Sequence, residues 1–198
     1  MLYRRGNSLT FGGKTAMKAV PANRYLTFFS IALLGCAVDL ATKARIFALL
    51  GQPGGETLWV WRPFFGLQTS LNQGALFGMG QGKVWLFATL SVAAAIGIVY
   101  WLFVTGAAVD WLLTVALGAV MAGILGNLHD RLGLWTLNGQ RVYAVRDWIL
   151  FRYHDWSWPN FNLADSFLVC GAALLMWHAF RSQPKREVPT GIPAERSS

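Results

Sequence analysis

The stretch PNFNLADSFLVCG, Pro159 to Gly171, places a carboxylate at the start of a hydrophobic segment. Asn162 can cap a helix that begins here, and Asp165 then occupies the third helical position, where an acid suits the positive end of the helix dipole. From Phe167 to Trp177 almost every residue is apolar. An acid at the mouth of a membrane helix costs free energy, so either capping or a function must account for it.

The composition indicates an integral membrane protein. Of the 198 residues, 55% are hydrophobic and 13% are charged, whereas in a typical soluble domain about a quarter of the residues are charged. The net charge of +8 reflects basic terminal tails, which are typical of cytoplasmic flanks and not of a nucleic-acid surface. We therefore expect no nucleic-acid partner. The basic residues of the tails are Arg4, Arg5, Lys14, Lys18 and Arg24, then Arg181, Lys185, Arg186 and Arg196.

Four segments are long and apolar enough to cross a bilayer, which takes roughly 20 residues. We predict spans at about residues 25–50, 84–104, 107–128 and 163–180. The fold class that follows is an all-α membrane protein with four transmembrane helices and a small periplasmic β lobe. The expected divisions are a cytoplasmic basic tail over residues 1–24, a four-span domain over 25–181 and a disordered cytoplasmic tail over 182–198.

The two long connections, residues 51–83 and 129–161, differ from the spans in composition. The first is rich in aromatic and β-branched residues, which predicts a small strand-bearing lobe. Several of their aromatic side chains suit a membrane–water interface. These are Trp59, Trp61, Phe64, Trp148, Trp156 and Trp158.

Two further features concern the first span and the cysteines. The stretch IALLGCA, residues 31–37, resembles the end of a bacterial lipoprotein signal peptide, but the lead before it is long and more spans follow. A retained first span is therefore the better interpretation. Cys36 and Cys170 both fall in apolar runs, where we expect small buried hydrophobic side chains.

Polar residues of the predicted spans gather at one side of the membrane. With both tails inside, they lie at the outer ends of the first, third and fourth spans. Ionisable groups at membrane depth indicate a functional site, which we place at the outer interface. The residues are Asp39 and Lys43 in the first span, Asn127, Asp130 and Arg131 in the third, and Asn162 and Asp165 in the fourth.

The spacing of these residues predicts which of them share a helix face. Asp39 and Lys43 are four residues apart and can form an ion pair. A structural role for this pair is favoured over a direct part in the chemical reaction. Gly123, Asn127 and Arg131 are also spaced by four. On that face the glycine could merely permit close helix packing, and the arginine could extend to the interface.

A second acid, Asp147, leads into the apolar run from Trp148 to Phe151. Two carboxylates close together in a dry pocket share one proton, so that one serves as acid and the other as base. Aspartic proteases use this asymmetry to activate water. Spacing alone does not show that Asp147 and Asp165 meet.

Other functions fit the sequence less well. A metal site could use His129, His154, Asp130 and Asp155, but their spacing matches no helical two-histidine zinc motif, so we expect no metal or cofactor. A transporter or channel would show internal repeats or broken helices, which the sequence lacks. A presenilin-like intramembrane protease would carry a glycine–aspartate signature, which is also missing.

Five motifs in order resemble the lipoprotein signal peptidases, the signal peptidase II family. They are VDLATK (38–43), NQGALFG (72–78), GILGNLHDR (123–131), VRDWI (145–149) and FNLADS (161–166). The resemblance implies a multi-pass protease of the bacterial cytoplasmic membrane with both termini cytoplasmic and its active site near the periplasmic face. Such enzymes cleave prolipoproteins before a cysteine that carries diacylglycerol. We expect a monomer whose partners are lipid-modified prolipoproteins and the phospholipid bilayer.

The resemblance also implies roles for particular residues. Asp147 and Asp165 correspond to the catalytic pair. The supporting and substrate-binding residues would be Asp39, Lys43, Asn72, Gly123, Asn127, Arg131, Asn162 and Ala164. Two features depart from the family pattern: the interval between Arg131 and Asp147 is long, and Arg146 and Trp148 flank the acid where hydrophobic residues are common.

Overall fold

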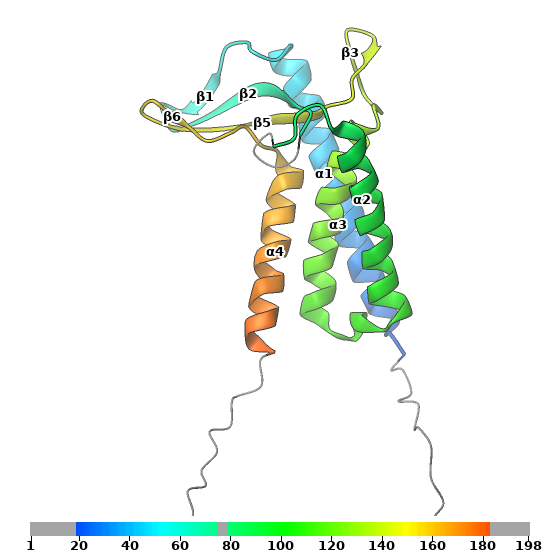
Figure 1. Ribbon diagram of the computed structural model, residues 1–198. Coiled ribbons are helices and arrows are strands. Elements are labelled where there is room, and N and C mark those ends of the chain that lie inside the picture. The colour runs from blue at the N-terminus through cyan, green and yellow to red at the C-terminus, as the bar shows by residue number, and fades with distance from the viewer. Residues whose placement is uncertain (1–18, 75–78, 183–198) are drawn as a thin grey trace, which may run out of the picture.

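Four long helices form the body of the molecule in the computed structural model, which describes residues 19–74 and 79–182 (Figure 1). Each is long and apolar enough to cross a membrane, which confirms the four predicted spans. They are α1 (Ala22–Leu50), α2 (Val84–Val99) with its π-helical extension η2 (Tyr100–Val104), α3 (Trp111–Arg131) and α4 (Leu163–Arg181). The first helix begins three residues before the predicted start, and the third ends three residues beyond the predicted end.

A tight connection joins the second and third helices. Gly106 adopts a left-handed conformation with φ of 83°, which glycine tolerates without strain, and the short helix η3 (Ala107–Val109) follows it. Asp110 then caps α3, its carboxylate accepting a hydrogen bond of 2.9 Å from the Leu113 amide. The second and third spans therefore form a helical hairpin.

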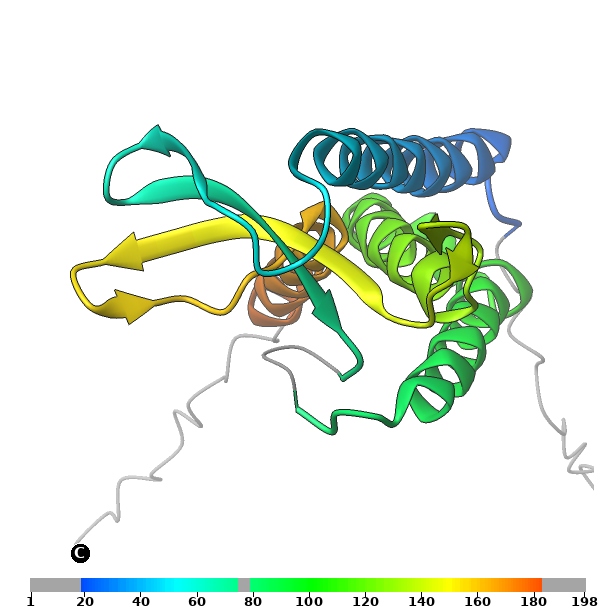
Figure 2. The ribbon, with the colours of Figure 1, turned by 90° about the horizontal axis from the view of Figure 1, so that it is seen from above.

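The third helix is the centre of the bundle and packs against both α1 and α4. Small residues on α3 and α4 permit this close approach, as is common between membrane helices. A Cβ on Gly123 would overlap the Ala164 carbonyl oxygen and the Leu168 side chain, and one on Gly171 would lie 2.6 Å from Val120 Cγ2. The arrangement brings the upper ends of α1, α3 and α4 together (Figure 2).

A four-stranded antiparallel sheet lies across one end of the bundle and projects beyond α4 (Figures 1 and 2). Its order is β1 (Leu58–Trp61), β2 (Phe65–Asn72), β5 (Val145–Tyr153) and β6 (Trp156–Ser157). The first long connection does bear strands, as predicted. The second contributes the central strand β5, which the sequence did not indicate, because six of its nine residues are buried and show no alternation.

The long segment after α3 contains a second small hairpin. Strands β3 (Thr136–Leu137) and β4 (Gln140–Arg141) are joined by Asn138 and Gly139, both with positive φ, which is the usual chemistry of a two-residue hairpin turn. Trp135 below it is buried against Phe47, and its indole N–H donates to the Ala144 carbonyl over 3.2 Å. The base of this hairpin is therefore packed onto α1.

Two predictions from the sequence are wrong. Trp148 is 9% exposed and packs among Phe47, Trp135 and Ile149 and does not sit at an interface, because β5 is covered on both faces. Cys170 is exposed on the surface of α4 and not buried.

Parts of several predictions lie outside the described residues. These are residues 1–18 of the N-terminal tail, residues 183–198 of the C-terminal tail and the last four positions of NQGALFG. The stretch IALLGCA lies within the continuous helix α1.

Candidate active site

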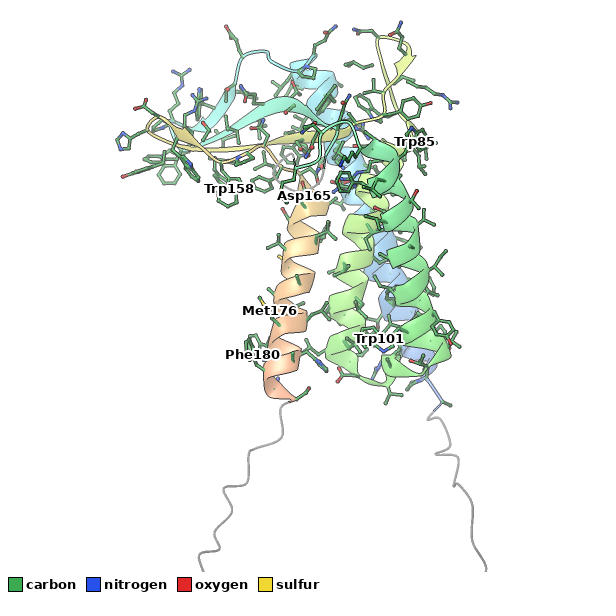
Figure 3. The ribbon with its side chains drawn as sticks, viewed as in Figure 1. Trp85, Trp101, Trp158, Asp165, Met176 and Phe180 are labelled. Carbon is green, nitrogen blue, oxygen red and sulfur yellow. The ribbon has the colours of Figure 1, made fainter. Side chains whose placement is uncertain are left out.

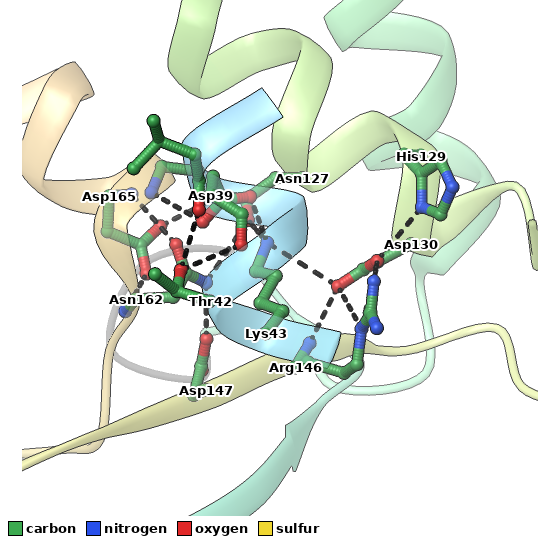
Figure 4. Close-up of polar contacts among 12 residues, drawn as sticks. Asp39, Thr42, Lys43, Asn127, His129, Asp130, Arg146, Asp147, Asn162 and Asp165 are labelled. Atoms are coloured by element: carbon green, nitrogen blue, oxygen red, sulfur yellow. Dashed lines mark hydrogen bonds and ion pairs between the residues drawn. The ribbon is translucent and has the colours of Figure 1, made fainter. Parts of the chain in front are cut away.

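Asp147 lies on β5, at the edge of the bundle, and is 2% exposed. Its Oδ1 accepts a hydrogen bond of 2.6 Å from the Asn162 side-chain amide (Figure 4). The Asn72 side chain, at the end of the neighbouring strand β2, also donates a hydrogen bond to it. The carboxylate is thus held by two amides from separate segments.

Asp165 is placed by the cap of α4. Asn162 accepts from the Asp165 amide over 3.0 Å, and the Asp165 carboxylate accepts from the Asn162 amide over 3.2 Å. This reciprocal capping box confirms the predicted cap. The same geometry turns the Asp165 side chain back toward the sheet at the top of α4, where Figure 3 shows it beneath the strands.

Two asparagines connect the acids (Figure 4). The Asn127 amide on α3 donates to Asp165 over 2.8 Å, and the Asn162 amide donates to the Asn127 oxygen over 3.1 Å as well as to Asp147. The structure therefore brings together Asp147, Asp165, Asn127 and Asn162 from a strand and two helices. Sequence spacing could not show this meeting.

The predicted ion pair between Asp39 and Lys43 is confirmed, with 2.8 Å between Nζ and Oδ2 and both side chains fully buried. Lys43 also donates to Asn127 over 2.9 Å. Asp39 accepts from the Ala164 amide over 2.9 Å, so the pair links α1 to the first turn of α4. Gly126 faces Asp39 so closely that a Cβ would overlap the carboxylate.

The remaining predicted residues surround this network. Arg131 donates to the Gly74 carbonyl over 3.1 Å, and its charge acts on both Asp147 and Asp165. Gly123 and Ala164 lie at the contact of α3 with α4. For Gly123 the geometry corresponds to the packing role considered from the sequence.

Asp130 and Arg146 form a second buried pair that sequence reasoning missed. Asp130 is fully buried and contacts Arg146 and Lys43 at 2.7 and 3.4 Å. The sequence placed Asp130 among the polar residues at the end of the third span and did not indicate this partner. The unusual arginine beside Asp147 was the available signal, since a charged residue next to an apolar run needs a partner.

The environment of Asp147 favours its neutral form. Burial away from water and the nearby Asp165 carboxylate together raise the pKa of Asp147 to about 8, against the lowering effect of the hydrogen bonds from Asn162 and Asn72. The surroundings of Asp147 therefore favour retention of one proton by the pair of carboxylates.

An apolar groove has Asp165 in its lining. Its volume is about 440 Å³, and it runs between α4 and the underside of the sheet. Aromatic side chains form much of one wall and α4 forms the other, and the polar lining residues are Asn72, Asn160, Asp165 and Ser166. Its lining consists of Asn72, Phe151, Trp156, Trp158, Pro159, Asn160, Phe161, Asp165, Ser166, Val169 and Cys170.

The alternative metal site does not assemble. Within residues 19–74 and 79–182, no three His, Cys, Asp or Glu side chains gather in a way that could hold a metal ion. His129 contacts Asp130 at 3.2 Å, whereas His154 and Asp155 lie in the turn between β5 and β6.

Comparison with known families identifies the architecture. The sequence profile of signal peptidase II matches residues 31–181. The chain belongs to the signal peptidase II family. A lipoprotein signal peptidase of Rhodopirellula baltica is 48% identical over 167 residues, covering 82% of this chain and 75% of that protein. One from Aeromonas hydrophila is 35% identical over 169 residues, covering 82% and 93%.

Solved structures agree with this assignment. A bacterial membrane enzyme solved by the in meso method at 2.3 Å resolution superposes with a TM-score of 0.67 at 29% identity, covering 82% of this chain and 94% of that one. A second such structure, at 1.9 Å, gives a TM-score of 0.65. As a signal peptidase II, the protein is a protease with four membrane helices, as the sequence predicted.

Replacing Asn162 by alanine tests the asparagine bridge. The substitution removes the helix cap, which should lower the free energy of unfolding by about 1 to 2 kcal/mol. It also removes the side-chain hydrogen bonds from Asn162 to Asp147 and to Asn127, so cleavage should slow while the protein stays folded. Thermal unfolding in detergent and prolipoprotein cleavage measure the two effects.

Asn23→Ala is the matched control, because Asn23 is exposed at the start of α1, at the end of the bundle opposite the sheet, and its side chain accepts a hydrogen bond of 3.2 Å from the neighbouring Arg24. It should cleave at the rate of the parent. An Asn162→Ala enzyme with full activity would show that the bridge is dispensable.

Proposed function

We propose that Asp147 and Asp165 are the catalytic pair of an aspartic endopeptidase that removes signal peptides from diacylglyceryl-modified prolipoproteins. The bond cleaved would be the one before the lipidated cysteine. The observation that carries this proposal is the convergence of two acids, the buried Asp147 from β5 and the half-buried Asp165 from α4, on one asparagine bridge beside an apolar groove.

The two acids have different surroundings, which suggests different roles. Asp165 accepts hydrogen bonds from the Asn127 side chain and the Asn162 amide at a helix N-terminus, and Arg131 is near. These groups favour a carboxylate. Asp147, with its raised pKa, holds the proton. Asp165 is therefore the general base and Asp147 the general acid.

The reaction follows from these roles. Asp165 takes a proton from water as the water oxygen attacks the peptide carbonyl carbon, and Asp147 gives its proton to the carbonyl oxygen. In the second half, Asp165 returns its proton to the leaving nitrogen as the C–N bond breaks. Asp147 recovers a proton from the diol hydroxyl as the new carboxyl group forms, so both acids return to their starting states.

The groove accounts for the lipid on the substrate. Its aromatic and aliphatic walls suit an acyl chain or an apolar signal segment, and Asp165 in its lining would be accessible to a peptide bond. Figure 3 shows Trp158 beside this end of α4. A substrate anchored by lipid would thus bring its scissile bond to the membrane surface, where the acids lie.

The orientation in the membrane follows from the positions of the charges. The start of α1 and the end of α4 lie at the end of the bundle opposite the sheet (Figure 1). The basic tails continue from these ends, so we place both termini in the cytoplasm and the sheet with the acids at the periplasmic face of the inner membrane. Arg146 does not oppose this orientation, because it is buried and paired with Asp130.

Amide substitutions test the catalytic pair. Asp147→Asn and Asp165→Asn keep the shape of each side chain but remove its proton transfer, so each should lower kcat by about 100-fold or more. Cleavage of a purified diacylglyceryl-modified prolipoprotein is the measurement. Asp155→Asn, in the exposed turn before β6, should leave cleavage unchanged.

Robust cleavage by either asparagine variant would refute the pair. Loss of parental activity on thorough chelation, with recovery on adding zinc, would move the chemistry to the histidines.

The pH dependence should report the shared proton. The rate should rise as one acid ionises and fall as pH passes about 8, where Asp147 loses its proton. Since the folded-state pKa is raised above the ordinary value of about 3.9, Asp147 also loses stabilising free energy as pH rises toward 8. Between pH 6 and 9 the parent should therefore lose more thermal stability than Asp147→Asn. Equal losses would contradict a protonated Asp147.

Cysteine labelling tests the orientation. In a background lacking Cys36 and Cys170, a cysteine at Gln140, on the exposed strand β4, should react with an impermeant maleimide in intact spheroplasts. A cysteine at Thr190, in the C-terminal tail, should react only after lysis. The reverse pattern would place the sheet in the cytoplasm.

A further inference from the structure

We propose that Arg146 is a positioning residue that holds the start of β5 on the last turn of α3 and thereby sets the place of the Asp147 carboxylate. The inference rests on the proposed catalytic role of Asp147.

The contact between Arg146 and Asp130 fixes the backbone as well as the side chain. The Arg146 amide donates to Asp130 Oδ2 over 3.0 Å, Nη2 donates to Oδ1 over 2.7 Å, and Nε lies 3.2 Å from both oxygens. Such a forked, charge-assisted contact is directional. The guanidinium carbon also lies 4.7 Å from the centre of the Trp135 ring, so the side chain is held from two sides.

Strand geometry transmits this restraint to the next residue. Successive side chains of a strand point to opposite faces, so Arg146 contacts Asp130 while Asp147 contacts Asn162. The pairing of β2 with β5 is irregular between Leu67 and Ser70, just before Ser70 pairs with Asp147. Where a ladder is interrupted, its hydrogen bonds specify the register less strongly. Asp147 thus stands at the end of a short regular stretch in which Leu71 pairs with Arg146, and the contact of Arg146 with Asp130, here called the clamp, adds a second restraint to this stretch.

The same turn of α3 restrains the other acid. Asn127 precedes Asp130 by three residues, so the two lie next to each other on one turn of α3. The Asn127 side chain donates a hydrogen bond to Asp165 over 2.8 Å. One rigid turn therefore holds Asp165 through Asn127 and the strand of Asp147 through Asp130. The separation of the two carboxylates depends on both contacts.

The charges of the clamp also matter. Asp39 and Asp130 are balanced by Lys43 and Arg146. Removing Arg146 alone would leave an unbalanced carboxylate near Asp147, whereas removing Asp130 as well would restore the balance but not the clamp. The two effects can therefore be separated by substitution.

The test compares Arg146→Met, Arg146→Lys and the double variant Arg146→Met/Asp130→Asn with Arg152→Met. Arg152 lies on the same strand, and its Nε contacts Ser157 Oγ at 3.1 Å near the exposed end. Steady-state cleavage of the lipid-modified substrate gives kcat and KM, and thermal unfolding in detergent shows whether each protein is folded.

A displaced catalytic group lowers turnover without weakening substrate binding, and a shift of about 1 Å can cost about 100-fold. Arg146→Met should therefore lower kcat by about 10- to 100-fold with KM within about twofold. Arg146→Lys, which keeps the charge but not the fork, should recover part of the loss. The double variant should stay impaired, and Arg152→Met should match the parent.

A folded Arg146→Met enzyme with parental kcat would overturn the inference, as would full recovery in the double variant, which would make charge balance the cause. If Arg146→Met does not insert, Arg146→Lys decides: parental kcat overturns the inference, and a reduced kcat at unchanged KM supports it. Cleavage by Asp147→Asn would instead refute the proposed function. An inactive Asp147→Asn beside a parental Arg146→Met would refute the positioning role alone.

Discussion

A single buried ammonium group holds the upper ends of three helices together. Lys43 has no exposed surface and lies 2.8 Å from Asp39, 2.9 Å from the Asn127 oxygen and 3.4 Å from Asp130. A charge so far from water is tolerated only when partners surround it. Through Asp39 it reaches the first turn of α4, and through Asp130 it reaches the start of β5. The positions of both candidate catalytic acids therefore depend on one cation in α1.

The sheet and the helices contribute differently to the site. The helices hold acids and amides at fixed positions along their axes. Asn127 and Asp130 lie within one turn of α3, and the cap of α4 holds Asp165 beside Asn162. The strand supplies Asp147 from above, at the level where the bundle ends (Figure 1). Because the two acids come from different kinds of element, each can be held by its own restraints while they share one bridge of asparagines.

The spacing of residues in the sequence predicted those features whose residues lie close together in the chain. Runs of about 20 apolar residues predicted the four spans. The interval of four residues predicted the ion pair of Asp39 with Lys43, and the interval of three predicted the capping contact between Asn162 and Asp165. The strand β5 escaped prediction because a segment covered on both faces has no period of two. The pair of Asp130 with Arg146 was not predicted, because the two residues are 16 positions apart with a separate hairpin between them. No helical or strand periodicity relates residues at that separation.

The groove below the sheet also bears on how substrate arrives. Its α4 wall ends in Val169 and Cys170, which are exposed on the outer surface of the bundle, where acyl chains of the bilayer would surround them. A prolipoprotein anchored by its own acyl chains could then enter sideways, without leaving the hydrocarbon layer. Encounter would occur in two dimensions, at a frequency set by the surface density of substrate and the fluidity of the bilayer. The degree to which such an enzyme is saturated is set by the mole fraction of substrate in the membrane and depends little on the bulk concentration of substrate.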